Sequence, residues 1–267
     1  MSDRVQVEIN DGIAEVRLNR PDKMNALDGA MFDAIIEAGE GLKSEPSVRA
    51  VVVSAEGRAF CAGLDFSGFQ SMAGQNDGAD TGSVAKIDEG RITHRGQHVS
   101  WVWQELEVPV IAAVHGVAFG GGLQVALGAD IRIVSPDARL SVLEIRWGLS
   151  PDMTATQLLP RLVGVDVAKE LTWTGREVSG TEAVQIGLAT KVADDPRAAA
   201  MELAGEIASK SPQAIRGAKH LINLASEQDW ATGFAEERRV IGSLIGSPNQ
   251  VEAITAYFEK REANYQD

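Results

Sequence analysis

The first residues of the chain alternate between apolar and polar side chains. This alternation covers Val5–Ile9 and Ile13–Leu18, and the turn sequence Asn10-Asp11-Gly12 separates the two runs. A period of two residues on both sides of such a turn predicts a β-hairpin. Three later runs are almost wholly apolar, which predicts buried strands. These runs are Ala50–Ser54, Val110–Val114 and Ile131–Val134.

Apolar residues at helical spacing lie between these runs. Met31, Ile35 and Leu42 share one face of a predicted helix. Asp28 is the candidate N-cap of this helix, which is expected to end near Lys43. The other helices predicted before residue 190 are Ile92–Leu106, Leu123–Leu127, Thr154–Leu162, Asp166–Trp173 and Thr181–Ile186.

Two segments lack clear periodicity. Residues 67–90 place several glycines among Gln, Asn, Asp and Ser, so we expect an irregular, mobile segment. Lys191–Asp195 is expected to be a turn. From Pro196 onward the pattern is helical, and Ser247-Pro248-Asn249-Gln250 is a capping box that starts the last helix. These last helices carry apolar faces with little core of their own, which predicts docking on a neighbouring subunit.

Composition and charge restrict the partners of the chain. Its 267 residues carry a net charge of −13, which argues against nucleic acid or an anionic membrane surface as a partner. Cys61 is the single cysteine, so an internal disulfide is excluded and a reducing compartment is expected. The first residues show no apolar signal region, and no run is long enough to span a bilayer. We expect a cytoplasmic protein.

The most informative stretch is Val114–Asp130, in which glycines at positions 120 to 122 separate a strand from a short helix ended by Gly128. This order directs free main-chain N–H groups at a ligand, so the stretch is a candidate site for a phosphate or an oxyanion. A tight turn between strand and helix is the alternative. The dinucleotide-binding glycine spacing is absent, and no lysine of the P-loop type follows.

A second stretch, Ala59–Phe66, follows another apolar strand, and the two stretches together closely resemble the crotonase family of enoyl-CoA hydratases and isomerases. The resemblance runs from about residue 5 to the C-terminus. It implies an α/β fold, a spiral of repeated ββα turns with a C-terminal helical trimerisation region. The segments that carry it are Asn19–Leu27, Ala59–Asp65, His115–Gly122, Pro160–Gly164, Leu171–Arg176 and Glu182–Leu188.

The resemblance also implies an organisation and a substrate. We expect a core with the CoA-thioester site at residues 1–195 and a helical oligomerisation region at residues 196–267. The partners implied are an acyl-CoA thioester and further copies of the chain, as a homotrimer or a homohexamer made of two trimers. No separate cofactor is expected, because CoA is part of the substrate. The segment near residues 67–100 is expected to supply the walls of the acyl pocket.

The residues that match the family motifs receive expected roles. The backbone N–H groups of Leu64 and Gly121 would form an oxyanion hole for a thioester enolate. Asp65 is expected to order its loop, and Cys61 to be a small buried residue rather than a nucleophile. Lys23, Lys260 or Arg261 would face the CoA phosphates, with solvated surface charge as the alternative. The substrate path would be lined by Lys23, Met24, Ala26, Ala62, Gly63, Asp65, Phe66, Phe119, Gly120 and Leu143.

Three positions determine the expected reaction. Family hydratases use two glutamates, and the matching positions here are Gln124 and Glu144. An amide cannot exchange a proton at neutral pH, although it can orient water. Asp152 follows Glu144 by eight residues, a spacing similar to the Glu and Asp pair of dienoyl-CoA isomerases. The alternatives are an ion pair between Glu144 and Arg146, and an N-cap role for Asp152.

We therefore predict isomerisation of a double bond in an enoyl- or dienoyl-CoA, with Glu144, Asp152 and Gln124 as the catalytic set. Hydration of a 2-enoyl-CoA, with Gln124 holding water, is one alternative, and a non-catalytic acyl-CoA binder is another. A metal site at His94 and His98 is disfavoured, because no acidic or cysteine partner is identifiable from the sequence. An esterase is disfavoured because the chain has no Gly-x-Ser-x-Gly elbow.

Overall fold

A computed structural model describes residues 3–65, 87 and 90–267. Its larger sheet has the strand order β1-β2-β3-β4-β6-β9, in which β1 and β2 are antiparallel and all other neighbours are parallel. These strands are β1 (Val5–Asn10), β2 (Ile13–Leu18), β3 (Ala50–Ala55), β4 (Val110–Val114), β6 (Ile131–Val134) and β9 (Lys191–Val192). A smaller sheet has the order β5-β7-β8, with β5 (Val117–Phe119), β7 (Arg139–Ser141) and β8 (Val178–Ser179).

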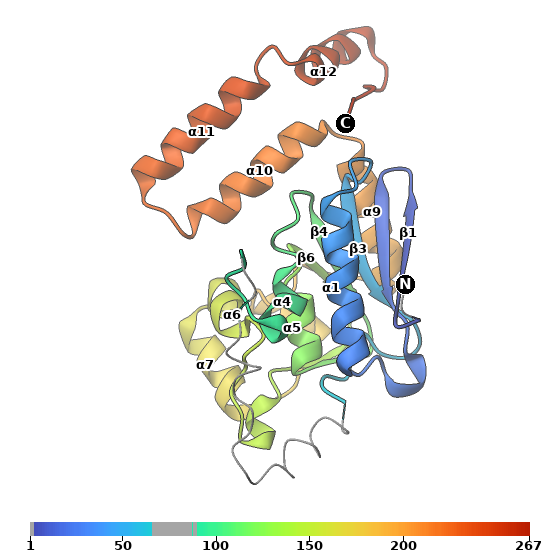
Figure 1. Cartoon of the computed structure of the whole chain (residues 1–267), viewed down its shortest axis with the longest axis vertical. Helices are drawn as coiled ribbons and strands as arrows, with labels where there is room; N and C mark the ends of the chain where they lie inside the picture. Colours follow the sequence, from blue (N-terminus) through green and yellow to red (C-terminus); the bar gives the residue numbers. More distant parts are fainter. Residues whose placement is uncertain (1–2, 66–86, 88–89) are drawn as a thin grey trace.

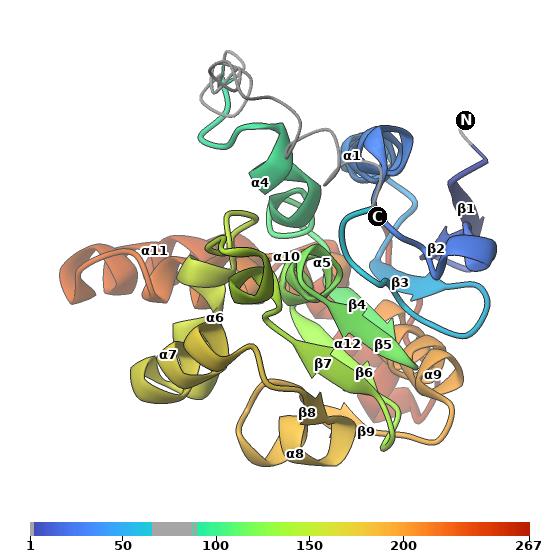
Figure 2. The ribbon, with the colours of Figure 1, turned by 90° about the horizontal axis from the view of Figure 1, so that it is seen from below.

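Helices cover both faces of the larger sheet, as Figures 1 and 2 show. In β3, Val51 and Val53 point into the main core, while Ala50 and Val52 pack under α9. Because both faces are buried, these strands read as continuous apolar runs rather than as alternating ones. The helices from α1 to α9 are α1 (Gly29–Lys43), α4 (Arg95–Trp101), α5 (Gly121–Leu127), α6 (Ala155–Val163), α7 (Val165–Thr174), α8 (Gly180–Gln185) and α9 (Pro196–Ala208); η1 (Pro21–Lys23) and η2 (Glu144–Trp147) are 3₁₀ turns.

The last three helices extend away from the sheets (Figure 1). They are α10 (Pro212–Ala225), α11 (Trp230–Leu244) and α12 (Pro248–Glu259). Lys219 anchors α10 to the core through an ion pair with Asp130 at 2.8 Å. Trp230 and Tyr257 are each about four-fifths exposed, at 83% and 79%. Such exposed apolar faces are the kind that subunit contacts cover. The self-association, the division at residue 195 and the trimer or hexamer all stay predictions.

A cavity of about 1110 Å³ separates α10 and α11 from the core. Lys219, Leu127 and Leu158 are among its lining residues, and none of the predicted site residues lines it. The cavity therefore belongs to the junction between the C-terminal helices and the core. Within the described residues, no helix has the length and apolar character needed to cross a membrane.

Most of the predicted elements are confirmed. The hairpin turns at Asp11 and Gly12, which both have positive φ, and its strands are paired in register. Asp28 caps α1 by accepting a bond from Met31 N at 2.8 Å. Ser247 caps α12 by accepting from Gln250 N. These elements were predictable because local side-chain chemistry determines where they begin.

Two expectations were wrong and one cannot be compared. The predicted helix Ile92–Leu106 is shortened to α4, because the side chain of His94 caps it and the chain turns after Trp101 to enter β4. The expected turn Lys191–Asp195 contains β9, which pairs with the open edge of β6. Apart from residues 87 and 90, the predicted mobile segment 67–90 lies outside the described residues.

Candidate active site

The first part of the candidate site is the amino end of α5. Gly120 precedes this helix with a φ of 51°, in the left-handed region that favours glycine, and its N–H donates to Ser141 O at 2.9 Å. The N–H of Gly121 is the first of the helix and has no acceptor within the described part of the chain. This group is therefore available to bind an oxygen atom of a ligand.

The second part is the loop that follows β3. Leu27 forms an isolated parallel bridge with Leu64, in which Leu27 N donates to Gly63 O at 2.8 Å and Asp65 N donates to Leu27 O at 3.0 Å. This bridge uses main-chain groups on both sides of Leu64. The N–H of Leu64 itself has no acceptor among residues 3–65, 87 and 90–267.

The two loops pack directly against each other. Phe119 N donates to Cys61 O at 3.1 Å. Gly63 has a φ of 91°, and a Cβ atom there would lie 2.6 Å from Phe119 O and 3.8 Å from Gly121 N. Only glycine fits this approach. The free N–H groups of Leu64 and Gly121 therefore belong to adjacent loops, an arrangement suited to stabilising an oxyanion.

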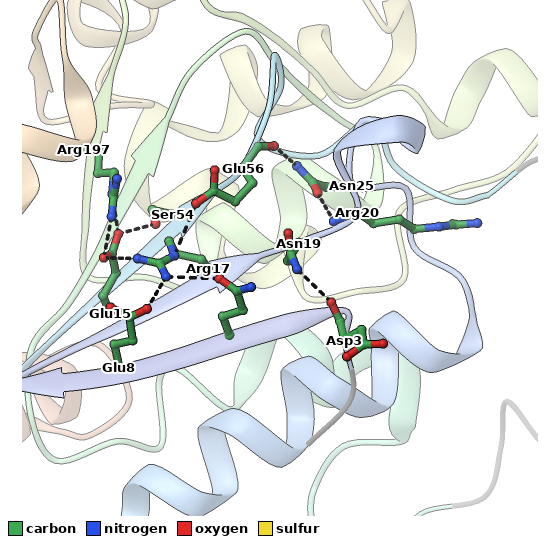
Figure 3. A network of polar contacts seen from close by, with 11 residues as sticks. Asp3, Glu8, Glu15, Arg17, Asn19, Arg20, Asn25, Ser54, Glu56 and Arg197 are labelled. Carbon is green, nitrogen blue, oxygen red and sulfur yellow. Dashed lines mark hydrogen bonds and ion pairs between the residues drawn. The ribbon is translucent and has the colours of Figure 1, made fainter.

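A polar network holds the loop before α1 against the Leu64 loop. Arg20 forms an ion pair with Asp65 at 2.6 Å. Asn25 is buried; its Oδ1 accepts from Arg20 N at 2.7 Å, and its Nδ2 donates to the carbonyl of Glu56 at 2.9 Å (Figure 3). The same Nδ2 donates to the carbonyl of Ala59 at 2.8 Å. Asp65 thus has a structural partner one residue after Leu64. Sequence reasoning identified no role for Arg20 or Asn25 beyond the motif that contains them.

Glu144 places a carboxylate beside these loops. Its Oε1 accepts a bond from Gln124 Nε2 at 2.6 Å, and its Oε2 is buried with no hydrogen-bond partner in the described residues. A Cβ atom on Gly120 would lie 3.4 Å from Glu144 Oε1, so the carboxylate abuts the start of α5. Burial raises the pKa of Glu144, and the charge of Asp152 acts in the same direction. An ion pair of Glu144 with Arg146 is not found among the described residues.

Asp152 is exposed and immediately precedes the buried turn that leads into α6. Its alternative role as an N-cap is wrong, because α6 begins at Ala155 and Thr154 occupies the N-cap position without a side-chain bond. The turn is instead held by Gln124, whose Oε1 accepts from Met153 N at 2.9 Å and from Ala155 N at 3.1 Å. The amide of Gln124 therefore bonds both Glu144 and the turn that follows Asp152.

The predicted substrate-binding residues surround these loops. Lys23 is exposed on η1 and has no partner among the described residues, while Phe66 lies outside them. Sequence reasoning assigned no role to Arg58, an exposed basic residue that follows the buried strand β3. Its position shortly after that strand was the available signal. Gly57, the residue before Arg58, packs against Pro21, since a Cβ atom on Gly57 would lie 2.6 Å from Pro21 Cβ. The half-buried members of the predicted set are Met24, Ala26, Ala62, Asp65, Phe119 and Leu143; Gly63 and Gly120 are buried.

The two C-terminal candidates for phosphate binding lie elsewhere. Arg261 forms ion pairs with Glu252 and Glu259, at 2.6 and 2.7 Å. The tail that follows α12 binds Arg49, at the amino end of β3, whereas the candidate site follows the carboxyl ends of the strands. Within one chain, the segment that follows α12 therefore lies at the amino end of β3 and away from the candidate site (Figure 1).

Neither Cys61 nor the histidine pair forms a reactive centre. Burial raises the pKa of Cys61 to about 12, and its thiol donates to Asn25 O at 3.0 Å. His94 and His98 do not converge, because His94 Nδ1 accepts from Gly96 N while His98 Nε2 pairs with Glu40 at 2.6 Å. The ligand atoms of Glu40, His98 and Glu105 lie within 4.8 Å of one another. The ammonium of Lys43 already binds both of those carboxylates.

Comparisons with known proteins agree with this geometry. Residues 8–267 match the family model described as Enoyl-CoA hydratase/isomerase. The chain is 34% identical to a short-chain-enoyl-CoA hydratase of Clostridium acetobutylicum over 253 residues, 94% of this chain and 92% of the relative. It is 32% identical to a mitochondrial Delta(3,5)-Delta(2,4)-dienoyl-CoA isomerase of Mus musculus over 256 residues, 94% of this chain and 77% of the relative.

A solved structure shows the same fold. The enoyl-CoA hydratase of Bacillus anthracis matches with a TM-score of 0.87 and 31% sequence identity, over 98% of each chain. This match confirms the predicted α/β crotonase-like fold. Because the family model covers nearly all of the sequence, this chain is an enzyme that belongs to the enoyl-CoA hydratase/isomerase family.

Proposed function

We propose that the chain isomerises a carbon–carbon double bond in an enoyl- or dienoyl-CoA thioester. One observation carries the proposal: the carboxylate of Glu144 abuts the amino end of α5, and its Oε2 is buried with no hydrogen-bond partner among the described residues. Burial raises the pKa of Glu144 toward the range that suits a group that both takes and returns a proton. The dienoyl-CoA isomerase relative supports this assignment.

The proposed reaction needs only proton transfers. Glu144 removes a proton from a carbon of the acyl chain, and the electron pair of that C–H bond moves through the conjugated system onto the thioester oxygen. The N–H groups of Leu64 and Gly121 bind this enolate oxygen, each contributing about 3–4 kcal/mol. The electron pair then returns to a different carbon, which takes a proton from Glu144 or from Asp152. No atom is gained or lost, and the double bond has moved.

Proton exchange in heavy water tests this proposal. The protein is incubated with enoyl- and dienoyl-CoA compounds in D₂O, and mass spectrometry follows deuterium in the acyl chain. We expect incorporation by the natural protein and a loss of about a thousandfold or more in Glu144→Gln, which cannot take the proton. Unchanged exchange in Glu144→Gln would remove Glu144 from the mechanism.

Hydration of a 2-enoyl-CoA is the second candidate. It is favoured by relatives named as hydratases, including the crotonyl-CoA hydratase of Syntrophomonas wolfei. In this reaction Glu144 would take a proton from water while the hydroxide adds to one carbon and a proton adds to its neighbour. Rapid loss of enoyl absorbance with crotonyl-CoA would favour hydration. Tight binding of CoA thioesters with neither reaction would instead favour a non-catalytic acyl-CoA binder.

Lys23 is proposed to contact a phosphate group of CoA. It is exposed on η1, in a chain whose net charge of −13 repels anions. Lys23→Ala is expected to raise the KM for CoA thioesters several-fold at low salt, and less at high salt because the interaction is screened. Lys210→Ala removes the same charge at an exposed position at the end of α9 and serves as the control. An unchanged KM at low salt contradicts the assignment.

A further inference from the structure

Gln124 is a buried side chain of the candidate site that bonds on both sides of its amide. Only 1% of this residue is exposed, and its amide makes three hydrogen bonds. Oε1 accepts from Met153 N at 2.9 Å and from Ala155 N at 3.1 Å, while Nε2 donates to Glu144 Oε1 at 2.6 Å. Main-chain N–H groups only donate and an ionised carboxylate only accepts, so a single orientation of the amide satisfies all three partners.

The turn held by Gln124 is strained. Thr154 has a φ of 83°, an unfavourable conformation for a β-branched residue. Its Oγ1 is buried without a partner in the described residues, so the side chain does not cap α6. Gln124 supplies the missing acceptor at both Met153 N and Ala155 N. Asp152 immediately precedes this turn, so the same two bonds fix the backbone that carries its carboxylate.

The third bond distinguishes the two oxygens of Glu144. Oε1 is occupied by Gln124, whereas Oε2 is buried and has no described partner. Oε2 is therefore the oxygen that is free to take a proton from a substrate. The bond from Nε2 also prevents rotation of the carboxylate, which would exchange the two oxygens.

We propose that Gln124 is a positioning residue that holds Glu144 and the Asp152 turn in a fixed relation and directs the site toward proton transfer rather than hydration. This inference rests on the proposed isomerase function and explains how it is achieved. Both lone pairs of Gln124 Oε1 are used by main-chain N–H groups, so this amide has no acceptor left for a water molecule. Water activation would depend on Glu144 alone.

Two substitutions separate the bonds of the amide. Gln124→Met has a similar length and removes all three bonds. Gln124→Glu keeps an acceptor for the Met153 and Ala155 N–H groups, but it replaces the donor facing Glu144 with a second carboxylate oxygen. Gln104→Met is the matched control, because Gln104 Nε2 donates to Gly128 O at 2.7 Å near the other end of α5. Circular dichroism and thermal unfolding establish that each variant is folded.

The readouts are kcat, KM and the pH profile of deuterium exchange into the acyl chain. Gln124→Met is expected to lower kcat about a hundredfold with KM changed less than about threefold, because misplacement of reacting groups acts on the chemical step. The acid limb of the pH profile of Gln124→Met should move to higher pH. The bond from Gln124 lowers the pKa of Glu144, so its loss raises that pKa. In Gln124→Glu the limb should also move to higher pH, because two adjacent carboxylates share one proton. Gln104→Met should match the natural protein.

A double-substitution comparison tests the link to Asp152. If Gln124 acts partly by fixing the Asp152 turn, then Asp152→Asn should reduce exchange less in the Gln124→Met background than in the natural protein. The proposal is overturned if Gln124→Met retains the natural kcat and acid limb while Glu144→Gln abolishes exchange. It is also overturned if Gln124→Glu, once shown to be folded, keeps the natural pH profile. Absence of exchange in the natural protein would instead reject the isomerase function itself.

Discussion

Two glutamates withdrawn from solvent have opposite surroundings in this molecule. Glu15 lies in β2, is 7% exposed, and receives four bonds. Arg197 donates to it twice, at 2.6 and 2.8 Å, Ser54 Oγ donates at 2.8 Å, and Arg17 donates at 3.1 Å (Figure 3). Burial raises the pKa of Glu15, but the bonds from Arg197 and Ser54 outweigh it and hold that pKa below its ordinary value. Glu144 receives one side-chain bond, from Gln124, and its pKa is raised.

The difference lies in the partners of the two carboxylates as well as in their burial. The carboxylate of Glu15 is neutralised by arginines, so it is a stable anion that ties α9 to the sheet. Glu144 is bonded to a neutral amide, and Asp152 adds a negative charge nearby. A buried carboxylate is suited to proton transfer only when its surroundings leave the two protonation states close in free energy. The raised pKa of Glu144 brings it closer to that condition, and the lowered pKa of Glu15 takes it further away.

The largest expected effect separates activity from stability. Glu15→Gln should keep kcat for the acyl-CoA reaction within about twofold, whereas Glu144→Gln should lose about a thousandfold. Glu15→Gln should lower the free energy of unfolding by about 2 kcal/mol, because it leaves Arg197 without its carboxylate partner. This value is below that of a fully buried pair because the Arg197 side chain is half exposed. Arg17 keeps its ion pairs with Glu8 and Glu56. Glu144→Gln should be as stable as the natural protein or more so.

Urea unfolding and steady-state rates on the same preparations check this prediction. Glu206→Gln is a suitable control, since Glu206 also lies on the described part of the chain, in α9, and carries a charge of the same sign. A large loss of kcat in folded Glu15→Gln would show that the polar network contributes to the reaction. A large loss of stability in Glu144→Gln would show that its ionised form supports the fold.

Much of the fold was predictable because it depends on local patterns. Buried strands and the hairpin followed from apolar runs and the Asp11-Gly12 turn. The strands β5, β7, β8 and β9 have two or three residues, and neighbouring strands determine their pairing. The alternation in β2 predicts that Glu15 faces solvent. Its burial depends on Arg197, which is 182 residues away in the sequence.

In the candidate site, too, the locally encoded parts were predictable and the long-range contacts were not. Glycine clusters after apolar strands indicated both loops, because close backbone approach requires glycine at positions such as Gly63. The connection from Gln124 to the turn at Met153 was not predictable, since it joins a side chain to main-chain N–H groups 29 residues away. The positive φ of Thr154 was also not predictable, because a threonine gives no local signal for that conformation.

The pH dependence of stability should distinguish the two glutamates by sign. The folded pKa of Glu15 is lowered, so its contribution is present above the unfolded value and is lost as the pH falls through the folded pKa. The folded pKa of Glu144 is raised, so its ionised form lowers stability above that pKa, and this penalty disappears as the pH falls toward 4.5.

Unfolding free energies from about pH 3 to about pH 8 therefore form a second test. Glu15→Gln should be less stable than the natural protein at neutral pH, and this deficit should shrink in acid. Glu144→Gln should be more stable at neutral pH, and this excess should shrink as Glu144 becomes protonated. The window for Glu144 lies above 4.5 and that for Glu15 lies below it. Differences of the same sign in the two variants would contradict the assigned surroundings.

The smallest expected effect concerns the strain beside Glu144. Thr154→Gly removes an unfavourable φ and a buried hydroxyl without a described partner, but it increases the freedom of the unfolded chain. The net result should be a gain of about 1 kcal/mol in the free energy of unfolding. Exchange should stay within about twofold of the natural protein, because the bonds from Gln124 still fix the turn.

Thr156→Gly is the matched control, because Thr156 is exposed on the first turn of α6 and has ordinary helical geometry. It should lose a few tenths of a kcal/mol, since glycine is a poorer helix former than threonine. A loss of stability in Thr154→Gly would mean that packing of the threonine methyl group outweighs the strain. A fall in exchange together with a gain in stability would mean that Gln124 alone does not hold the Asp152 turn in its working position. The strained backbone at Thr154 would then share that positioning role.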